Sequence, residues 1–476
     1  MTPVSRGNTP EPSPVLRPAQ LADVPAVPFP AKQQPAKLPA NEYEITSLPP
    51  SAVDDFLDHL DSVFNVTKPN GSQGASRALF QDHWEFDPER DPHGVFVAVA
   101  NSDQKIVSSV RVYNRQIHVN QQPPAAHPTG GIGDVATNLQ HRGKSLAKKL
   151  MNMADEYMHE TRGYKLGVLH AAPLAAPIYA SIGWKNVDLQ NITIDTTLAD
   201  VRKGHAVDSG NVKTIVFEKG GKELEVVRAL HSLVAPSILG SFARTSDDYW
   251  VDYIGKNNDP RRIVSRLLFT PDSKGADALK VGDCVGYAIC EVLRFDLGLL
   301  TSVLASGQEE VASISIQIKE VFCGKVATVD ENGFVTAVSA QTPSELSNTL
   351  SHLLSTTLQQ LLDSLPNNGE SLKVKLNSPA ALLPGEVLEA MSRGSAFDAA
   401  WWTKHEISNE VGWMFKVFEP FTVVRADGSI LQVFNEDDIE IVLGPVGEGG
   451  LPFAGCKGVT LKQGSSVFGF LKTDAF

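Results

Sequence analysis

The sequence has few cysteines, no long apolar run and no excess of basic residues. Its cysteines are scattered and form no CxxC pair: Cys284, Cys290, Cys323 and Cys456. This spacing excludes a disulfide framework and a cysteine zinc site, and it favours a reducing compartment. No stretch of about 18 uncharged apolar residues is present, and the N-terminus lacks a signal-peptide pattern. We therefore expect a soluble cytoplasmic protein without a membrane span or a bound metal.

Charge and length narrow the class further. The formal net charge is −13, which argues against nucleic acid as the main partner, because phosphate binding needs a basic footprint. An acidic chain suits a small cationic substrate such as an amine, although the same charge also keeps a protein soluble. The 476 residues exceed what one compact core accommodates, so two or three domains are expected.

Residues 1–41 stand apart from the rest. Ten prolines fall within residues 1–40, and no periodic apolar pattern accompanies them. Such a segment cannot bury enough surface to offset its ordering entropy. The sequence predicts a disordered proline-rich tail; whether it also docks onto a partner is left open.

Residues 42–200 are expected to form one α/β unit, because apolar residues recur there with alternating helical and strand periods. The predicted elements are, in order, helices from Ser51 and at Ser76–His83, strands at Val95–Ala100 and Ile106–Arg115, a strand at Ile132–Thr137, a long helix at Ser145–Arg162, a strand at Lys165–His170, a short helix at Ala175–Ser181 and a last strand near Val187–Ile194.

A second series of elements follows in residues 211–378. A helix is predicted around Glu223–Leu233, then three strands, a helix at Pro343–Leu365 and a strand at Ser371–Leu376. This order echoes the first unit and suggests an internal duplication. Residues 379–476 mix a short helix with β-rich stretches and are expected to form a C-terminal α+β region.

The most informative run extends from Gly130 to Ala147. It reads as a strand, a glycine-containing turn and the start of a helix, the context in which such a turn binds anions. Unpaired N–H groups at a helix N-terminus favour a phosphate. Gly143 allows close backbone approach, Ser145 is small, and Arg142 and Lys144 add positive charge. From the residues alone, phosphate binding and a purely structural turn are both open.

Two rival phosphate motifs are absent. There is no GxxxxGK[ST] run, which argues against a P-loop NTPase, and no GxGxxG followed by an acidic residue about 20 positions later, which argues against a dinucleotide-binding Rossmann unit.

The run Gln140–Ser145 resembles the Q/R-x-x-G-x-G/A signature of the GNAT family of N-acetyltransferases. The preceding strand residues Val135–Thr137 stand where that family has V-x-P. Further along, Ala175, Tyr179, Gly183 and Trp184 match the spacing of the family's A-x-x-x-Y-x-x-x-G-F segment. Ser145, Thr137 and Ala172 depart from the usual residues. The resemblance implies a mixed, mostly antiparallel, splayed sheet with flanking helices.

Within that family the chain resembles two groups, the bacterial enhanced-intracellular-survival acetyltransferases and the fungal lysine N6-acetyltransferases. Both pair a catalytic domain with a second acetyltransferase-like unit. No glycine-basic turn precedes the helix predicted at Pro343–Leu365, so the second unit is expected to be a degenerate copy that does not bind coenzyme A. In the bacterial group the terminal carboxylate serves as a base, which makes the Phe476 carboxylate a candidate here.

The resemblance also implies roles for individual residues. The Val135 N–H would polarise the thioester carbonyl, backbone groups of Val135 and Thr137 would hold the pantetheine arm, and Tyr179 would protonate the departing thiolate. The alternative for Tyr179 is a buried ring that only packs against the sheet. The residues expected to bind acetyl-CoA, the co-substrate, are Val135, Ala136, Thr137, Gln140, His141, Arg142, Gly143, Lys144, Ser145, Leu146 and Ala147.

The general base is open. His170 ends a predicted strand and has a suitable unperturbed pKa, but a histidine with a structural role is an equal alternative. Asp134 is a second candidate, although a structural carboxylate is the stronger reading, and the Phe476 carboxylate is the third. Trp401, Trp402 and Trp413 are candidates for lining an acceptor cleft, with core packing preferred.

These observations predict an acetyl-CoA-dependent N-acetyltransferase that acts on a primary amine of a small cationic acceptor, such as lysine, a polyamine or an aminoglycoside-like compound. The alternatives are a protein-lysine acetyltransferase and a non-catalytic acetyl-CoA sensor or scaffold. Homo-oligomerisation is left open.

Overall fold

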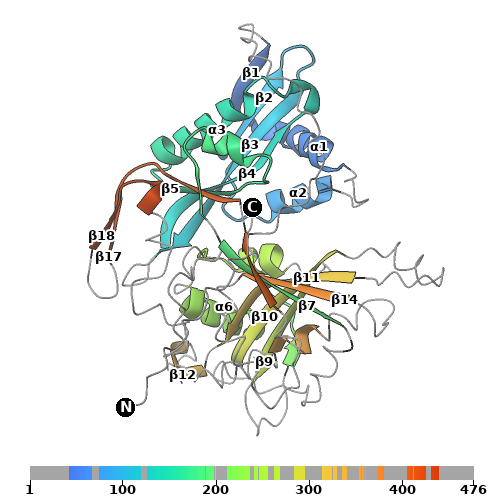
Figure 1. The fold of residues 1–476 in the computed structure, drawn as a ribbon, viewed down its shortest axis with the longest axis vertical. Helices are drawn as coiled ribbons and strands as arrows, with labels where there is room; N and C mark the ends of the chain where they lie inside the picture. Colours follow the sequence, from blue (N-terminus) through green and yellow to red (C-terminus); the bar gives the residue numbers. More distant parts are fainter. Residues whose placement is uncertain are drawn as a thin grey trace, which may run out of the picture.

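The protein folds around two seven-stranded sheets, one above the other in Figure 1. The structure is a computed structural model. It describes residues 42–66, 74–119, 126–187, 189–197, 199, 212–235, 241–244, 246–255, 262–268, 284–294, 313–323, 325–329, 335–339, 353–354, 356–358, 360, 373–379, 405–410, 412–424 and 430–438.

The first sheet is mixed and mostly antiparallel. Only β4 and β5 pair in parallel. The strands, in spatial order, are β1 (Tyr43–Ser47), β2 (Val95–Ala100), β3 (Ile106–His118), β4 (Ala126–Thr137), β5 (Leu166–His170), β16 (Trp413–Val417) and β6 (Lys185–Asn186). This arrangement confirms the predicted sheet type.

Helices cover both faces of this sheet because the strand residues alternate in direction. Val95 and Val97 of β2 belong to the core beneath α1 (Val53–Phe64) and α2 (Arg77–Glu85). Phe96 and Ala98 point the other way, into the core beneath α3 (Leu146–Glu156). Five short helical segments complete the described part of the unit: the 3-10 turns Pro50–Ala52, Pro92–Gly94 and Leu139–His141, the π-helical turn Tyr157–Thr161 and α4 (Ala176–Ala180).

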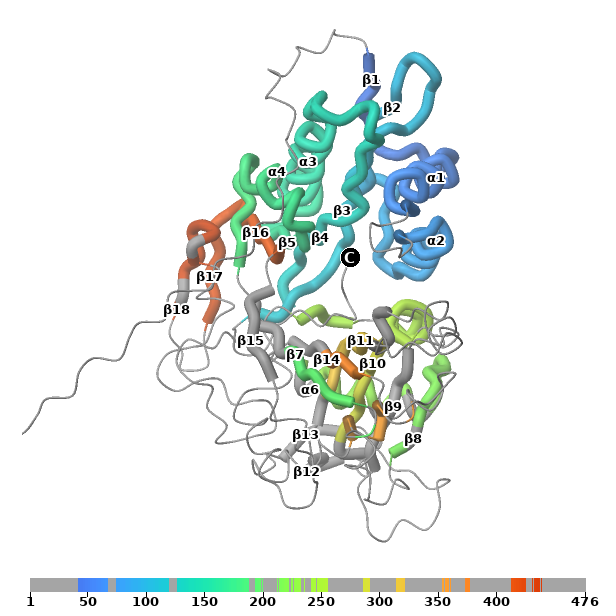
Figure 2. Tube along the Cα trace, turned by 45° about the vertical axis from the view of Figure 1, so that its right-hand side comes forward, coloured from blue at the N-terminus to red at the C-terminus, as the bar shows by residue number. Residues whose placement is uncertain are grey.

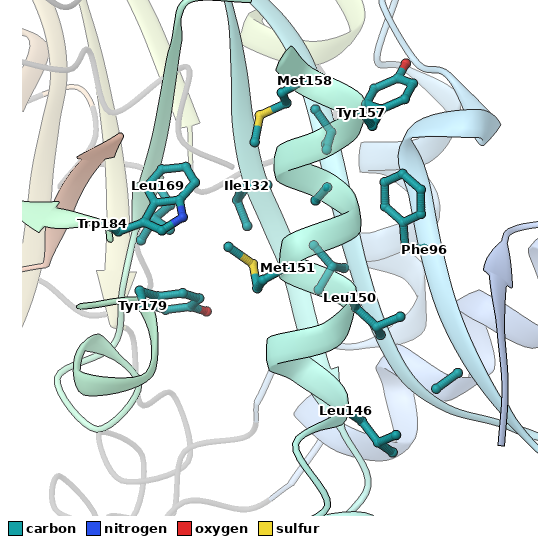
Figure 3. Close-up of a cluster of buried hydrophobic side chains, with 14 of the residues drawn as sticks. Phe96, Ile132, Leu146, Leu150, Met151, Tyr157, Met158, Leu169, Tyr179 and Trp184 are labelled. Atoms are coloured by element: carbon teal, nitrogen blue, oxygen red, sulfur yellow. The ribbon is translucent and has the colours of Figure 1, made fainter. Parts of the chain in front are cut away.

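The long predicted helix is confirmed in α3, which carries an apolar stripe with helical spacing. Leu146, Leu150, Met151 and Ala154 are all buried, in one cluster with Ile132 and Phe96 of the sheet; Figure 3 shows Leu150 and Met151 on the side of α3 that faces the sheet. Full burial of a leucine or methionine side chain contributes about 1.5–3 kcal/mol. This packing fixes the helix N-terminus at Leu146, next to the end of β4.

The second sheet repeats the pairing pattern of the first. Four strands pair antiparallel in chain order, one parallel pair follows, and two antiparallel strands complete it. The strands are β8 (Val212–Thr214), β9 (Arg262–Leu268), β10 (Cys284–Arg294), β11 (Ser313–Cys323), β14 (Lys373–Pro379), β7 (Leu189–Thr197) and β15 (His405–Glu410). The predicted helix near Glu223–Leu233 is α6 (Lys222–Val234), and Tyr249–Gly255 forms a π-helical turn.

Two hairpins are separate from both sheets, β12 (Lys325–Val329) with β13 (Val335–Ser339), and β17 (Phe421–Val424) with β18 (Ile430–Val433).

The two sheets exchange one strand each, which the sequence did not indicate. The strand expected near Val187–Ile194 as the last of the first sheet is instead β7, which pairs with β14 and β15 in the second sheet. In return β16, from the region 379–476, inserts between β5 and β6; it is the orange-red strand within the blue and green sheet in Figure 2. Local periodicity predicts that a segment is a strand but not which strand it pairs with.

Other predictions need adjustment or fall outside the described residues. The strand β1 was not predicted. The domain boundaries remain predictions, and the exchanged strands cross two of them. The tail 1–41, most of the helix predicted at Pro343–Leu365, Trp401, Trp402 and Phe476 lie outside the described residues. None of the described helices is long and apolar enough to cross a membrane.

The two units meet at the end of β3. Ile117 forms an isolated antiparallel bridge with Phe242, and the His118 N–H donates to the Ser241 carbonyl at 2.8 Å. Tyr249 and Tyr253 of the second unit lie over the Arg115 guanidinium, with ring centroids 5.4 and 5.7 Å away.

Candidate active site

An irregularity in the pairing of β3 with β4 marks the centre of the candidate site. The register passes from Ser109 opposite Ala136 to Arg111 opposite Gly133. Asp134 and Val135 therefore face the single residue Val110, which is a β-bulge. Asp134 has a left-handed backbone, with φ of 51°. A bulge turns backbone groups away from the regular ladder, so the Val135 N–H is placed differently from its neighbours along β4.

The strands β4 and β5 separate at the same level. Their parallel pairs run from Thr129 with Leu166 to Ile132 with Leu169 and then stop. Beyond this point β5 follows β16, because the Ala171 N–H donates to the Gly412 carbonyl at 2.7 Å. The β5-facing edge of β4 is thus left open from the bulge onward, and an extended chain can add to such an edge.

The turn between β4 and α3 has the geometry of an anion site. Gly143 and Ser145 are both left-handed, with φ of 78° and 58°, and alternation of this kind directs successive N–H groups into one concavity. A Cβ built on Gly143 meets nothing within 4 Å. The first N–H groups of α3 have no intrahelical partner. A diphosphate therefore fits these residues.

These three features border one pocket of about 690 Å³. It is lined by β4 and the turn through Val135, Thr137, His141, Arg142, Gly143 and Ser145, by α3 through Leu146, Ala147 and Lys148, and by the α4 region through Ala172, Leu174, Ala175, Pro177, Ile178, Tyr179 and Ser181. Eight of the eleven residues expected to bind acetyl-CoA are in this lining.

The other three expected residues lie elsewhere. Ala136 is buried beneath α1, Gln140 is exposed outside the lining, and Lys144 reaches towards β1. Its ammonium contacts the Glu42 carboxylate at 2.9 Å and the Tyr43 hydroxyl at 2.8 Å. Tyr43 in turn bonds His141 Nδ1 at 2.9 Å. Lys144 thus ties the turn to the edge strand.

Sequence reasoning missed the apolar wall of the pocket and one basic residue. Leu174 and Ile178 are 88% and 44% exposed and both line the pocket, so a bound ligand would cover part of their apolar surface. Lys148, one helical turn after Lys144, also lines the pocket. A second lysine in the first turns of the helix was the available signal.

Tyr179 lies on the wall opposite the bulge. Its side chain extends from α4 towards α3 (Figure 3) and is 7% exposed. Burial raises the pKa of the Tyr179 phenol to about 12. Among the described residues no group hydrogen-bonds to this hydroxyl, which agrees with a role towards a ligand.

The candidate bases differ in their surroundings. His170 is exposed at the end of β5, with its ring 4.8 Å from that of Trp413, and it is not part of the pocket lining. Asp134 is engaged in a buried cluster: Tyr113 donates to its Oδ2 at 2.9 Å, and Arg111 lies 3.7 Å away. The Trp413 side chain is 2% exposed, which agrees with core packing rather than with an open cleft.

Comparison with known proteins identifies the first unit. Residues 44–187 match the model of the acetyltransferase (GNAT) domain. No curated protein sequence matches the chain. Among solved structures, the chain is similar to a conserved protein from Enterococcus faecalis V583 described as a probable N-acyltransferase, with a TM-score of 0.50 and 13% identity over 82% of this chain and 85% of that one.

Two further solved structures are more distant in shape. Eis1 from Mycobacterium abscessus has a TM-score of 0.41 and 13% identity over 78% of this chain and 73% of that one. Saccharomyces cerevisiae N-myristoyltransferase with bound myristoyl-CoA has a TM-score of 0.48 and 10% identity over 80% of each chain. The match over residues 44–187 and the splayed sheet identify this part of the chain as an acetyltransferase (GNAT) domain.

Proposed function

We propose that the protein transfers the acetyl group of acetyl-CoA directly to a primary amine of a small cationic acceptor, of the lysine, polyamine or aminoglycoside type. One observation carries this proposal. The bulge at Val135, the N-terminus of α3 and the Tyr179 phenol line the same pocket. An anion cradle, a carbonyl-polarising donor and a proton donor are the groups that thioester aminolysis requires.

Each residue then has a defined task. The left-handed turn at Gly143 and Ser145 and the guanidinium of Arg142 hold the diphosphate. The open edge of β4 binds the pantetheine arm, and the Val135 N–H donates to the thioester carbonyl. Transfer forms a bond from the amine nitrogen to the acetyl carbon and breaks the bond from that carbon to sulfur. Tyr179 gives its proton to the sulfur, and the amine loses one proton to a base.

The acceptor class rests on charge and accessibility. The chain carries a net charge of −13, which raises the local concentration of cations. A flexible protein tail is the less favoured acceptor, because β16, from the C-terminal region, pairs with β5 and brings that region onto the unit that carries the candidate site.

Besides Asp134, which is engaged in a buried cluster, the candidates for the base are His170 and the Phe476 carboxylate. Two variants test them: removal of residues Asp474–Phe476, and the substitution His170→Gln. The variant that lacks the base should have at least tenfold lower turnover and should lose the acidic limb of the pH–rate profile. Each variant is assayed for turnover from pH 6 to 9. Full activity with an unchanged limb excludes the group tested.

A panel of amines tests the function itself. The purified full chain is incubated with acetyl-CoA and lysine, spermidine, an aminoglycoside or a lysine-containing peptide, and thiol release is followed. We expect release with at least one small amine and little with the peptide. Binding of acetyl-CoA without thiol release for any amine would favour the sensor alternative, and preference for the peptide would favour a protein acetyltransferase.

A further inference from the structure

A buried cluster of charged and phenolic side chains lies behind the β4 bulge. Its members are Asp87, Arg111, Tyr113, Arg115 and Asp134, contributed by the segment after α2 and by β3 and β4. The four charged side chains are 0–7% exposed, and Tyr113 is completely buried. None of them lines the pocket of the candidate active site.

The cluster holds Asp134 from two sides. The Ser109 hydroxyl donates to the Asp134 carbonyl oxygen at 2.8 Å, and the Tyr113 hydroxyl donates to Asp134 Oδ2 at 2.9 Å. Asp134 has a left-handed backbone, which non-glycine residues rarely adopt unless neighbouring groups hold them there. The next residue, Val135, supplies the N–H on which the proposed function depends.

The hydrogen bonds continue away from the bulge. Arg111 Nη1 donates to the Tyr113 hydroxyl at 3.3 Å, and Arg111 Nη2 donates to Asp87 Oδ2 at 2.9 Å. Asp87 Oδ1 accepts from Arg115 at 3.0 Å. Each arginine therefore has a carboxylate partner, and the phenol of Tyr113 is oriented to donate to Asp134 because its oxygen accepts from Arg111.

We infer that Asp134 and Tyr113 are positioning residues of the transfer reaction, which lock the β4 bulge so that the Val135 N–H points at the thioester carbonyl. This inference rests on the proposed function and assigns Asp134 a role other than that of general base. A carboxylate that accepts from a buried tyrosine and neighbours a buried arginine is poorly placed to take a proton from an amine in the pocket.

Three variants separate positioning from base catalysis. Asp134→Asn keeps an acceptor for Tyr113 and tolerates the left-handed backbone, so it should retain at least a third of the turnover and the wild-type pH profile. Asp134→Ala loses both features and should lose turnover at least tenfold. Tyr113→Phe loses only the hydroxyl, and its turnover should fall about as much as that of Asp134→Ala.

A binding measurement reports on the Val135 N–H without requiring turnover. The ratio of the Kd for coenzyme A to the Kd for acetyl-CoA reflects the contact to the acetyl carbonyl. We expect Tyr113→Phe and Asp134→Ala to lower this ratio about threefold, which corresponds to the loss of one modest hydrogen bond. The Kd for coenzyme A itself should stay the same.

Tyr157→Phe is the matched control. Tyr157 is also buried and donates to a carboxylate, Asp91 Oδ2, at 2.6 Å, but it lies at the other end of the helix from Leu146 (Figure 3), and within the described part of the chain its hydroxyl has no hydrogen bond to the bulge. Its variant should keep the wild-type ratio and turnover, and thermal unfolding confirms that each variant is folded.

The inference is overturned if Tyr113→Phe keeps both turnover and the Kd ratio. It is also overturned if Asp134→Asn is as inactive as Asp134→Ala and loses a limb of the pH profile, since Asp134 is then the base. If the wild-type protein acetylates no amine, the proposed function fails, but the Kd ratio still tests the positioning.

Discussion

At the scale of single residues, the environment of Tyr179 determines what its phenol does. The ring is buried among apolar neighbours of the α3 core, and burial raises the pKa of the phenol to about 12. The phenol is therefore fully protonated at neutral pH, as an acid for a departing thiolate must be. The raised pKa also makes Tyr179 unsuitable as a base for the amine.

Replacement of the hydroxyl tests this role. Tyr179→Phe should lower kcat at least tenfold, because the thiolate then leaves unprotonated, and should leave the Kd for acetyl-CoA within about twofold, measured by calorimetry. Since the acid form persists up to about pH 12, kcat of the wild-type protein should not decline between pH 8 and 10. Equal kcat values for variant and wild type would limit Tyr179 to packing.

At the scale of elements, the turn from β4 to α3 combines left-handed backbone at Gly143 and Ser145 with the geometry of an anion site. The helix is anchored by its buried stripe, and Lys144 and His141 attach the turn to β1 through Tyr43. Gly143 supplies a left-handed residue at the point where the pocket is open. The element thus presents N–H groups in a fixed arrangement before any ligand arrives.

Alanine variants of two glycines, one in this turn and one outside it, test the assignment of the turn. Gly143 and Gly163 have φ of 78° and 65°, and a Cβ at either meets nothing within 4 Å. Replacement of either by alanine should lower the free energy of unfolding by about 1 kcal/mol through strain alone. Only Gly143→Ala should also raise the Kd for acetyl-CoA, by about fivefold for 1 kcal/mol. Equal Kd values for the two variants would contradict the assignment of the turn.

At the scale of the whole molecule, the exchange of β7 and β16 interlocks the two sheets, because the chain crosses from one sheet to the other at each of these strands. The first sheet includes β16 from the C-terminal region, and the second includes β7, which directly follows the first unit in sequence. Lys416 of β16 anchors this insertion: its ammonium contacts Asp155 Oδ2 at 2.7 Å and the Ile182 carbonyl at 2.8 Å. The contacts of α3 and of the segment after α4 therefore depend in part on a residue more than 200 positions away in sequence.

Removal of this anchor should destabilise the first unit. Lys416→Met leaves the carboxylate of Asp155, which is 11% exposed, without its cation. The cost should be about 2–3 kcal/mol, somewhat less than for a fully buried pair. The double variant Lys416→Met, Asp155→Asn should recover part of it. Lys165→Met, which breaks the exposed pair with Glu419 at 3.6 Å, should cost under about 0.5 kcal/mol.

The loss of unfolding free energy in Lys416→Met should depend on pH, and the direction of the Asp155 pKa shift determines how. Burial raises the pKa of Asp155, so the folded variant holds a proton that the unfolded chain releases. Its deficit, measured by urea unfolding, should therefore shrink as the pH falls towards the unfolded value of about 4. A deficit that grows on acidification would contradict this account of the anchor.

Several features could be predicted from the sequence because they are local. The helical spacing of Leu146, Leu150 and Ala154 agrees with the predicted helix α3, and the residues Gln140–Ser145 sufficed to predict a turn at its start, whose role in anion binding stays a prediction. The spacing to Tyr179 identified the second wall of the pocket. In each case the evidence lies within a few turns of chain, where periodicity and turn chemistry act.

Tertiary structure decided what depends on distant partners. Which strand completes which sheet is set by pairing across hundreds of residues, and for that reason β7 and β16 could not be assigned from their own residues. Asp134 was an ambiguous carboxylate in the sequence; Tyr113, Arg111 and the register shift of β3 against β4 determine its surroundings. By itself the sequence determined the strand, turn and helix that border the candidate site, because these are local, whereas packing between distant segments decided how those elements are held and which side chains line the pocket.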